Sequence, residues 1–378
     1  MDKKIIYLDH AATTPINNEV LKEMMPYLTE QYANPSSIHN FARKSKKAIE
    51  KAREQVANAI NAKKSEIYFT SGGTEADNWA ISGIANYYKD KGKHIITSSI
   101  EHPAIINTCK CLEEEGFKVT YLPVNNDGKV SIEDVENSIR KDTILISIMM
   151  ANNEIGTIQP IEEIGKIAKE RNIIFHTDAV QAVGSVFVDV EKLGVDLLSL
   201  SAHKFYGPKG AGVLYIKKGT NIEKFLNGGS QEKGRRSGTE NVPSIVGMGK
   251  AIEIATRNLI EHQRKISCLR DKTIEEILKV IPGTVLNGDE KDRLPGNVNI
   301  SFPKMDAENM ILNLDKEGII VSSGSACASG ELEPSHVLKA IGVSHEMAQC
   351  SLRFSFGEIN TISDVESLIK ALKRIVLG

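Results

Sequence analysis

Lys204 is a residue whose setting could make it a nucleophile. It lies in the Gly- and Pro-containing segment Ser201–Gly210, directly after the apolar run Val195–Leu200. A lysine amine at a strand end forms Schiff bases when desolvation or a neighbouring cation lowers its pKa, and His203 could assist in this. Taken alone, however, a loop lysine is more often solvated. The segment therefore indicates a site only if partners for Lys204 exist.

Asp178 is the first candidate partner. It closes a second apolar run that begins at Ile173, and Gln181 follows it. Pyridoxal phosphate requires a carboxylate at its pyridine nitrogen, because the protonated ring is the electron sink for carbanion chemistry. Gln181 could donate a hydrogen bond to the phenolic oxygen of the same ring. Asp178 could instead cap a helix, but its pairing with Lys204 favours cofactor binding.

The segment Thr70–Glu75 is a candidate phosphate site. It follows the apolar run Ile67–Phe69 and opens an amphipathic helical pattern, so free backbone N–H groups meet there and the helix dipole favours an anion. Gly73 and Thr74 are the expected ligands. The segment has neither a Walker loop nor a dinucleotide-binding fingerprint. Helix capping explains the same residues equally well.

The elements that must position these residues alternate along the chain. Short apolar runs alternate with helical patterns from Glu66 to Ile216, which predicts a mostly parallel sheet covered by helices on both faces. The last third changes character, with a long charged helical stretch over Ala251–Ile277 followed by strands and helices of a smaller α+β domain. Ligand sites favour interfaces between such parts.

Composition excludes several classes of protein. The 378 residues are 41% hydrophobic and 25% charged, as in ordinary globular proteins, and the formal net charge of -2 favours neither nucleic acid nor membrane as a direct partner. No apolar run approaches the roughly 20 residues of a membrane span. An odd number of cysteines without a signal-peptide core indicates a cytoplasmic protein with free thiols. The cysteines are Cys109, Cys111, Cys268, Cys327 and Cys350.

A series of motifs resembles the cysteine desulfurases of the NifS/IscS type, in the class V aminotransferase group of fold-type I pyridoxal-phosphate enzymes. The motifs occur in the order typical of that family, and together they are far more specific than any one of them. They are Tyr7–Pro15, Asn34–Ser37, Thr70–Glu75, Glu101–Ala104, Asn152–Gly156, Asp178–Gln181, Ser201–Lys204, Arg235–Thr239 and Ser322–Cys327.

The resemblance implies a fold with two domains. The large, cofactor-binding domain would be residues 15–257, with a mostly parallel seven-stranded sheet between helices. The small α+β domain would be residues 1–14 and 258–378, and it would carry a mobile loop with Cys327. The family also implies a homodimer with shared active sites, in which Thr239 reaches the phosphate bound by the neighbouring subunit.

The resemblance also assigns roles in cofactor binding. Lys204 would form the internal aldimine with pyridoxal 5'-phosphate, while Asp178 and Gln181 hold the ring. His102 would stack on the ring and move protons, although a His-Pro pair that caps a helix is equally plausible from the sequence alone. The phosphate ligands would be Gly73, Thr74, Ser201 and His203.

Substrate binding is assigned in the same way. Arg353 resembles the clamp for the substrate α-carboxylate, a task that suits the bidentate guanidinium. Asn153 and Asn34 resemble secondary ligands of the substrate and the ring. A lone arginine in a strand is more often a partner in a surface ion pair, so the role of Arg353 depends on the resemblance.

Cys327 narrows the reaction. It lies in the small-residue segment Ser322–Gly330, which is typical of a mobile loop, and burial as a small apolar residue is the alternative. We expect the Cys327 thiolate to take sulfur from L-cysteine as a persulfide, release L-alanine, and pass the sulfur to an iron–sulfur scaffold or another acceptor protein. The other four cysteines are expected to be buried structural residues.

Other functions remain open at this point. A selenocysteine lyase or another class V enzyme is the nearest alternative, and a cofactor-free scaffold on the same fold is the alternative that is not an enzyme. No resident metal site is expected, and Cys327 would meet an iron–sulfur cluster only transiently, through an acceptor.

Overall fold

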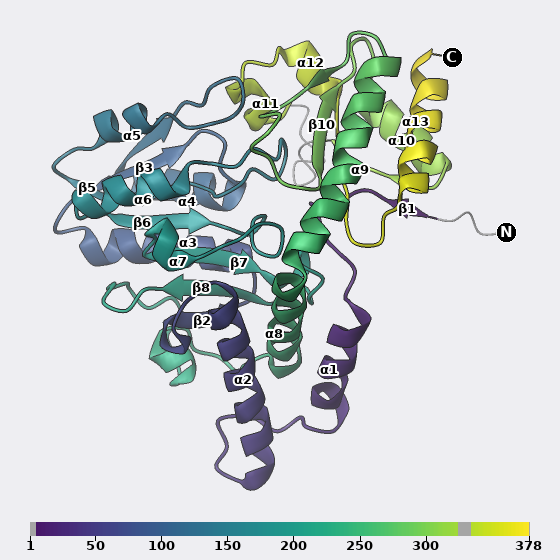
Figure 1. Ribbon diagram of the computed structural model, residues 1–378. Helices are drawn as coiled ribbons and strands as arrows, with labels where there is room; N and C mark the ends of the chain where they lie inside the picture. The colour runs from purple at the N-terminus through teal and green to yellow at the C-terminus, as the bar shows by residue number, and fades with distance from the viewer. Residues whose placement is uncertain (1–4, 324–333, 378) are drawn as a thin grey trace.

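The computed structural model describes residues 5–323 and 334–377. Within these residues the largest sheet has seven strands in the order β2-β8-β7-β6-β5-β3-β4 (Figure 1). In this sheet β8 runs opposite to the other six strands, so the expected mostly parallel sheet is confirmed. The strands are β2 (Ile67–Thr70), β3 (His94–Ser98), β4 (Lys118–Leu122), β5 (Thr143–Ser147), β6 (Ile174–Asp178), β7 (Leu197–Ser201) and β8 (Gly212–Ile216).

Helices cover both faces of this sheet. Alternate strand residues point to opposite faces, so Phe175 and Leu198 join one buried cluster while Leu145 and Leu197 join another. Figure 1 shows α6 and α7 in front of the sheet and α3 behind it. The helices around the sheet are α1 (Asn18–Thr29), α2 (Asn40–Ala59), α3 (Gly73–Tyr88), α4 (Pro103–Glu114), α5 (Ile132–Ser138), α6 (Ile161–Glu170), α7 (Val190–Leu193) and α8 (Val242–Arg257), with 3-10 turns η1 (Lys64–Glu66), η2 (Ala202–Lys204) and η3 (Gln231–Gly234).

The C-terminal part forms a second core. An antiparallel sheet of order β12-β10-β9 packs with helices around a separate buried cluster. The N-terminal strand β1 pairs parallel with β11, and Leu8 joins the same cluster. The elements are β1 (Ile6–Tyr7), α9 (Leu259–Val280), β9 (Val285–Leu286), β10 (Asn297–Ser301), α10 (Ala307–Lys316), β11 (Ile319–Ile320), α11 (His336–Ala340), α12 (His345–Gln349), β12 (Ser351–Ser355) and α13 (Ile362–Leu377).

Two expectations need correction. The helical stretch over Ala251–Ile277 is two helices, because Asn258 leaves helical geometry at φ -108° and ψ 16° between α8 and α9. Cys109 and Cys350 are buried as expected, but Cys111 and Cys268 are exposed. The domain boundary between residues 257 and 258 stays a prediction. No helix in the described part of the chain is long and apolar enough to span a membrane.

Candidate active site

The carboxyl ends of two neighbouring parallel strands bring the main candidates together. β6 ends at Asp178, β7 ends at Ser201, and Lys204 follows in the turn η2. Parallel strands end at the same edge of a sheet, where ligands bind in open α/β sheets. A cavity of about 410 Å³ opens there, which is within the size range of ligand sites. The predicted residues that line it are Gly73, Thr74, His102, Asn153, Asp178, Gln181, Ser201, His203, Lys204 and Arg353.

One end of the cavity suits a phosphate group. Gly73 is the first residue of the 16-residue helix α3, and no side chain caps that end. A Cβ atom at Gly73 would lie 2.7 Å from Cγ2 of Val180, so only glycine allows the backbone this close approach. Burial lowers the pKa of His203 to about 4, with Lys204 and Lys209 adding to the effect. A neutral His203 can therefore serve as a hydrogen-bond ligand beside the helix terminus.

Two buried carboxyl groups, those of Asp77 and Asp178, also line the cavity. Burial raises the pKa of Asp178, although the charges of His102 and Lys204 oppose this, and the Val180 N–H donates to Asp178 Oδ1 at 2.9 Å. The pKa of Asp77 lies well above its usual range because of burial and the charge of Asp178. Oδ1 of Asp77 has no hydrogen-bond partner among the described residues. A protonated pyridine nitrogen is a cation that fits this surplus of carboxyl groups.

Lys204 projects to the cavity from η2. Its Nζ donates to the carbonyl oxygens of Ala11 and Ala12, at 2.6 and 2.9 Å. Gln181 Nε2 donates to the same Ala11 carbonyl at 3.0 Å. The N-terminal segment therefore crosses the active site and contacts two of the predicted cofactor ligands.

His102 satisfies both interpretations of its sequence. It caps α4, and its Nδ1 accepts a hydrogen bond from the Ala104 N–H at 3.1 Å, while the ring also lines the cavity. Burial lowers the pKa of His102, and the charges of Lys204 and His336 add to this against the opposing charge of Asp178. Because Nδ1 accepts, the neutral ring carries its proton on Nε2.

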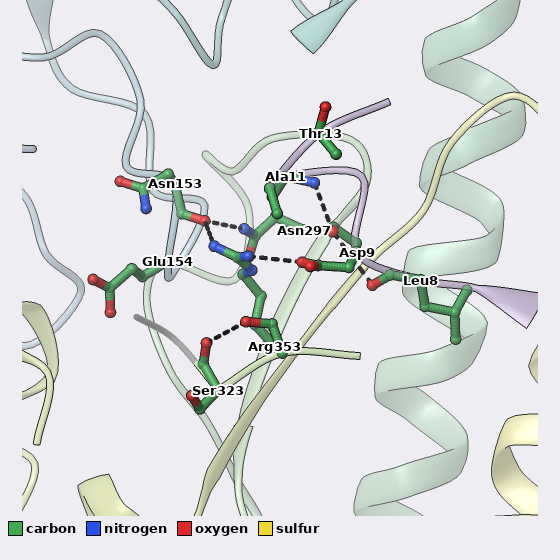
Figure 2. A network of polar contacts seen from close by, with 12 residues as sticks. Leu8, Asp9, Ala11, Thr13, Asn153, Glu154, Asn297, Ser323 and Arg353 are labelled. Carbon is green, nitrogen blue, oxygen red and sulfur yellow. Dashed lines mark hydrogen bonds and ion pairs between the residues drawn. The ribbon is translucent and has the colours of Figure 1, made fainter. Parts of the chain in front are cut away.

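Arg353 is buried rather than a surface residue. It is 1% exposed, on strand β12. Its Nη2 forms an ion pair with Asp9 Oδ1 at 2.8 Å, and its Nη1 donates to the Asn153 carbonyl at 3.0 Å (Figure 2). Asn297 Nδ2 donates to the same carbonyl at 3.1 Å. Arg353 thus lies at the junction of the N-terminal segment, the C-terminal sheet and the loop that carries Asn153.

Three predicted residues are not brought to this cavity by the described structure. Asn34 and Thr239 are exposed, and neither lines the cavity. Cys327 lies in residues 324–333, outside the described residues.

Sequence reasoning missed several residues of the cavity. Besides Asp77, they include Glu154 and His336. The Nε2–H of His336 donates to the Glu101 carbonyl at 3.0 Å, and Ser335 Oγ donates to Glu154 Oε2 at 2.5 Å. Glu101 directly precedes His102, and Glu154 directly follows Asn153. Their places beside predicted site residues could have indicated that they lie near the site. His336 offered no comparable signal.

Comparison with known proteins agrees with this geometry. The family model described as "Aminotransferase class-V" matches residues 6–368. The chain belongs to this family. Within it, the chain is 57% identical to "Cysteine desulfurase IscS" of Methanosarcina thermophila, over 99% of this chain and 93% of that protein. It is 55% identical to the protein of the same name from Dictyoglomus turgidum, over 99% and 95%.

Solved structures of class-V proteins share the fold. One described as "NIFS-LIKE PROTEIN" superposes with a TM-score of 0.93 at 40% identity, over 99% of each chain. Another, described as "SspA in complex with cysteine", has a TM-score of 0.83 at 39% identity, over 94% of this chain and all of that one. These likenesses place the chain in the cysteine desulfurase branch of the class-V family, whose members use pyridoxal phosphate.

Proposed function

We propose that this chain is a cysteine desulfurase that converts L-cysteine to L-alanine and keeps the sulfur as a persulfide on Cys327. One observation carries the proposal: a single cavity joins Lys204 and Asp178 of the large sheet to Arg353 of the C-terminal sheet. The similar solved protein described in complex with cysteine supports the choice of substrate.

Each wall of the cavity has a part in binding. Lys204 would bind pyridoxal phosphate covalently through Nζ, Asp178 would pair with the ring nitrogen, and the amides of Gly73 and Thr74 would hold the phosphate. Ser201 and His203 would complete the phosphate site, and Gln181 would hold the ring. When bound, the cofactor supplies an electron sink that weakens bonds at the substrate Cα and Cβ. Arg353 binds the substrate carboxylate, with Asn153 beside it.

Proton transfer falls to Lys204, and His102 assists it. The Lys204 amine, released when the substrate amine displaces it, would remove the proton from the substrate Cα and return one at the end of the reaction. Burial lowers the pKa of His102, and the neutral ring carries its proton on Nε2, so His102 can donate a hydrogen bond from Nε2 to the substrate as protons move. Its Nδ1 is engaged with the α4 backbone, which fixes the plane of the ring.

Sulfur transfer requires a nucleophile on the protein. The Cys327 thiolate attacks the substrate sulfur, so a new S–S bond forms while the substrate C–S bond breaks. The electron pair of the broken bond passes to the substrate Cβ, which is then protonated to give the methyl group of alanine. When an acceptor thiol attacks the outer sulfur of the persulfide, a persulfide forms on the acceptor and the Cys327 thiolate is released.

The two exposed ligands lead us to propose a homodimer with shared active sites. Thr239 would then reach the phosphate of the neighbouring subunit, and Asn34 would approach a site only across the interface. The sulfur acceptor would be an iron–sulfur scaffold or another acceptor protein. We expect the enzyme to act in the cytoplasm, where thiols stay reduced.

Cys327→Ser tests the proposal. We expect this variant to bind cofactor normally but to release no alanine from L-cysteine and to carry no protein-bound persulfide. Cys268→Ser, which changes an exposed cysteine in α9, is the matched control and should release alanine at the normal rate. Undiminished alanine release by Cys327→Ser would reject the role of that thiol.

A further inference from the structure

Asp9 provides a direct counter-charge for a buried arginine that lies 344 positions away in sequence. The Asp9 Oδ1 to Arg353 Nη2 distance is 2.8 Å. The arginine side chain is 2% exposed and that of Asp9 is 16% exposed. Burying a guanidinium is costly unless it is paired and hydrogen-bonded, so this contact contributes to the placement of Arg353.

The guanidinium is oriented from two sides. Asp9 holds Nη2, and the Asn153 carbonyl holds Nη1 at 3.0 Å (Figure 2). Nε of Arg353 is buried and has no hydrogen-bond partner among the described residues. Contacts at both terminal nitrogens stop rotation of the planar group, and they leave N–H donors for one more acceptor.

Asp9 is itself fixed by its neighbours. The Ser355 N–H donates to the Leu8 carbonyl at 2.7 Å, and the Ala11 N–H donates to Ser355 Oγ at 2.8 Å. The Tyr7 hydroxyl donates to the Asp9 carbonyl at 3.0 Å. Strand β12 therefore carries both Arg353 and the residue that anchors the backbone around Asp9.

The charges around Arg353 give its ion pair with Asp9 a consequence for substrate binding as well as for folding. Glu154 also lies near Arg353, whose charge opposes the rise that burial causes in the Glu154 pKa. A substrate carboxylate that reaches Arg353 therefore meets a guanidinium whose charge is already balanced. It can bind well only if the remaining N–H donors point into the cavity, since bidentate binding of a carboxylate depends on the orientation of the planar group.

We propose that Asp9 is a positioning residue for substrate recognition: it holds Arg353 so that the remaining donors of the guanidinium face the α-carboxylate of the amino acid. The inference rests on the proposed function, because it assigns a carboxylate-bearing substrate to the same cavity. It adds a substrate-selecting role to the N-terminal segment, which also contacts Lys204 through Ala11 and Ala12.

The test compares two small amines on the protein loaded with pyridoxal phosphate. L-alanine and ethylamine differ only in the carboxylate, and neither carries sulfur, so no sulfur transfer interferes. Binding of each is measured by the change in the cofactor absorption band. We expect Asp9→Ala to weaken L-alanine binding by about tenfold or more and to leave ethylamine binding unchanged, because a charge-assisted contact becomes misaligned.

Asp9→Asn separates geometry from charge. The amide keeps an oxygen acceptor for Arg353 Nη2 but removes the negative charge, so we expect its preference for L-alanine over ethylamine to equal or exceed that of the unaltered protein. An Asp9→Ala protein that keeps the full preference would overturn the proposal. Equal weakening of both amines would also overturn it, because that result indicates a general structural role.

Asp306→Ala is the matched control. It removes a carboxylate that accepts a hydrogen bond from the Asn309 N–H and caps α10, and Asp306 does not line the cavity, so we expect a lower melting temperature and an unchanged preference between the two amines. If the unaltered protein shows no preference for L-alanine, the proposed function fails and this inference fails with it. If the preference is present but does not depend on Asp9, only this inference fails.

Discussion

Two walls of the same cavity are built in different ways. The cofactor wall, formed by Gly73, Asp178, Ser201 and Lys204, lies where strands of one sheet end and helix α3 begins. In the carboxylate wall, Asn153 and Arg353 line the cavity, and Asp9 and Asn297 support them, so that four distant segments are joined through hydrogen bonds and one ion pair. Local motifs are therefore enough to set the first wall, whereas the second depends on how the two cores pack together.

The largest expected effect comes from the cofactor wall. Lys204→Ala should lower alanine release on the order of 10³-fold or more, because it removes both the covalent cofactor link and the base for the substrate Cα. Alanine release is measured with cofactor in excess. Lys209→Ala changes an exposed lysine of the same loop and should stay near normal activity. Comparable losses in both variants would contradict the assignment.

Asp178→Asn should have the next largest effect. The amide cannot hold a proton on the ring nitrogen, so the electron sink weakens and the turnover rate should fall on the order of 10²-fold. The absorption band of the bound cofactor should shift at the same time. Asp196→Asn, directly before β7 at the end of that strand away from the cavity, serves as control. An unshifted band with normal turnover would remove Asp178 from the cofactor wall.

Arg353→Lys should impair substrate binding and leave cofactor binding intact. A point charge replaces the planar fork, so KM for L-cysteine should rise about tenfold to hundredfold, with kcat and cofactor binding nearly unchanged. Steady-state kinetics with parallel measurement of bound cofactor checks this. A fall in kcat or in bound cofactor without a change in KM would mean that the walls do not act separately.

The smallest expected effect is a loss of folding stability at acidic pH. Burial lowers the pKa of His176, beneath the cofactor wall, to about 3 and that of His10, in the N-terminal segment, to about 4. The unfolded chain binds these protons first, so stability is fully present above pH 6.5 and is lost as the pH falls towards those values. Each histidine should cost about 1.4 kcal/mol per pH unit in that window.

Urea unfolding at pH 7 and pH 5 measures this loss. His10→Asn should show a smaller loss between the two pH values than the unaltered protein, because one titrating group is gone. An equal or larger loss in the variant would show that His10 is not held neutral.

The difference between the walls also explains what the sequence could predict. Asp178 closes one apolar run and Lys204 follows another, so the strand pattern already favoured a shared cofactor site for the two residues. The contact between Asp9 and Arg353 spans 344 positions and carries no local pattern. The break at Asn258 was missed because the charged helical pattern continues on both sides of it. Thr239 is predicted to act across subunits, and one chain cannot place it.

The most direct test of the account is to find which residue holds the cofactor. The protein loaded with pyridoxal phosphate is reduced with borohydride, digested, and mapped by mass spectrometry. The account predicts a single pyridoxyl group on the peptide that contains Lys204. A pyridoxyl group on a different lysine, or none on any peptide, would contradict it.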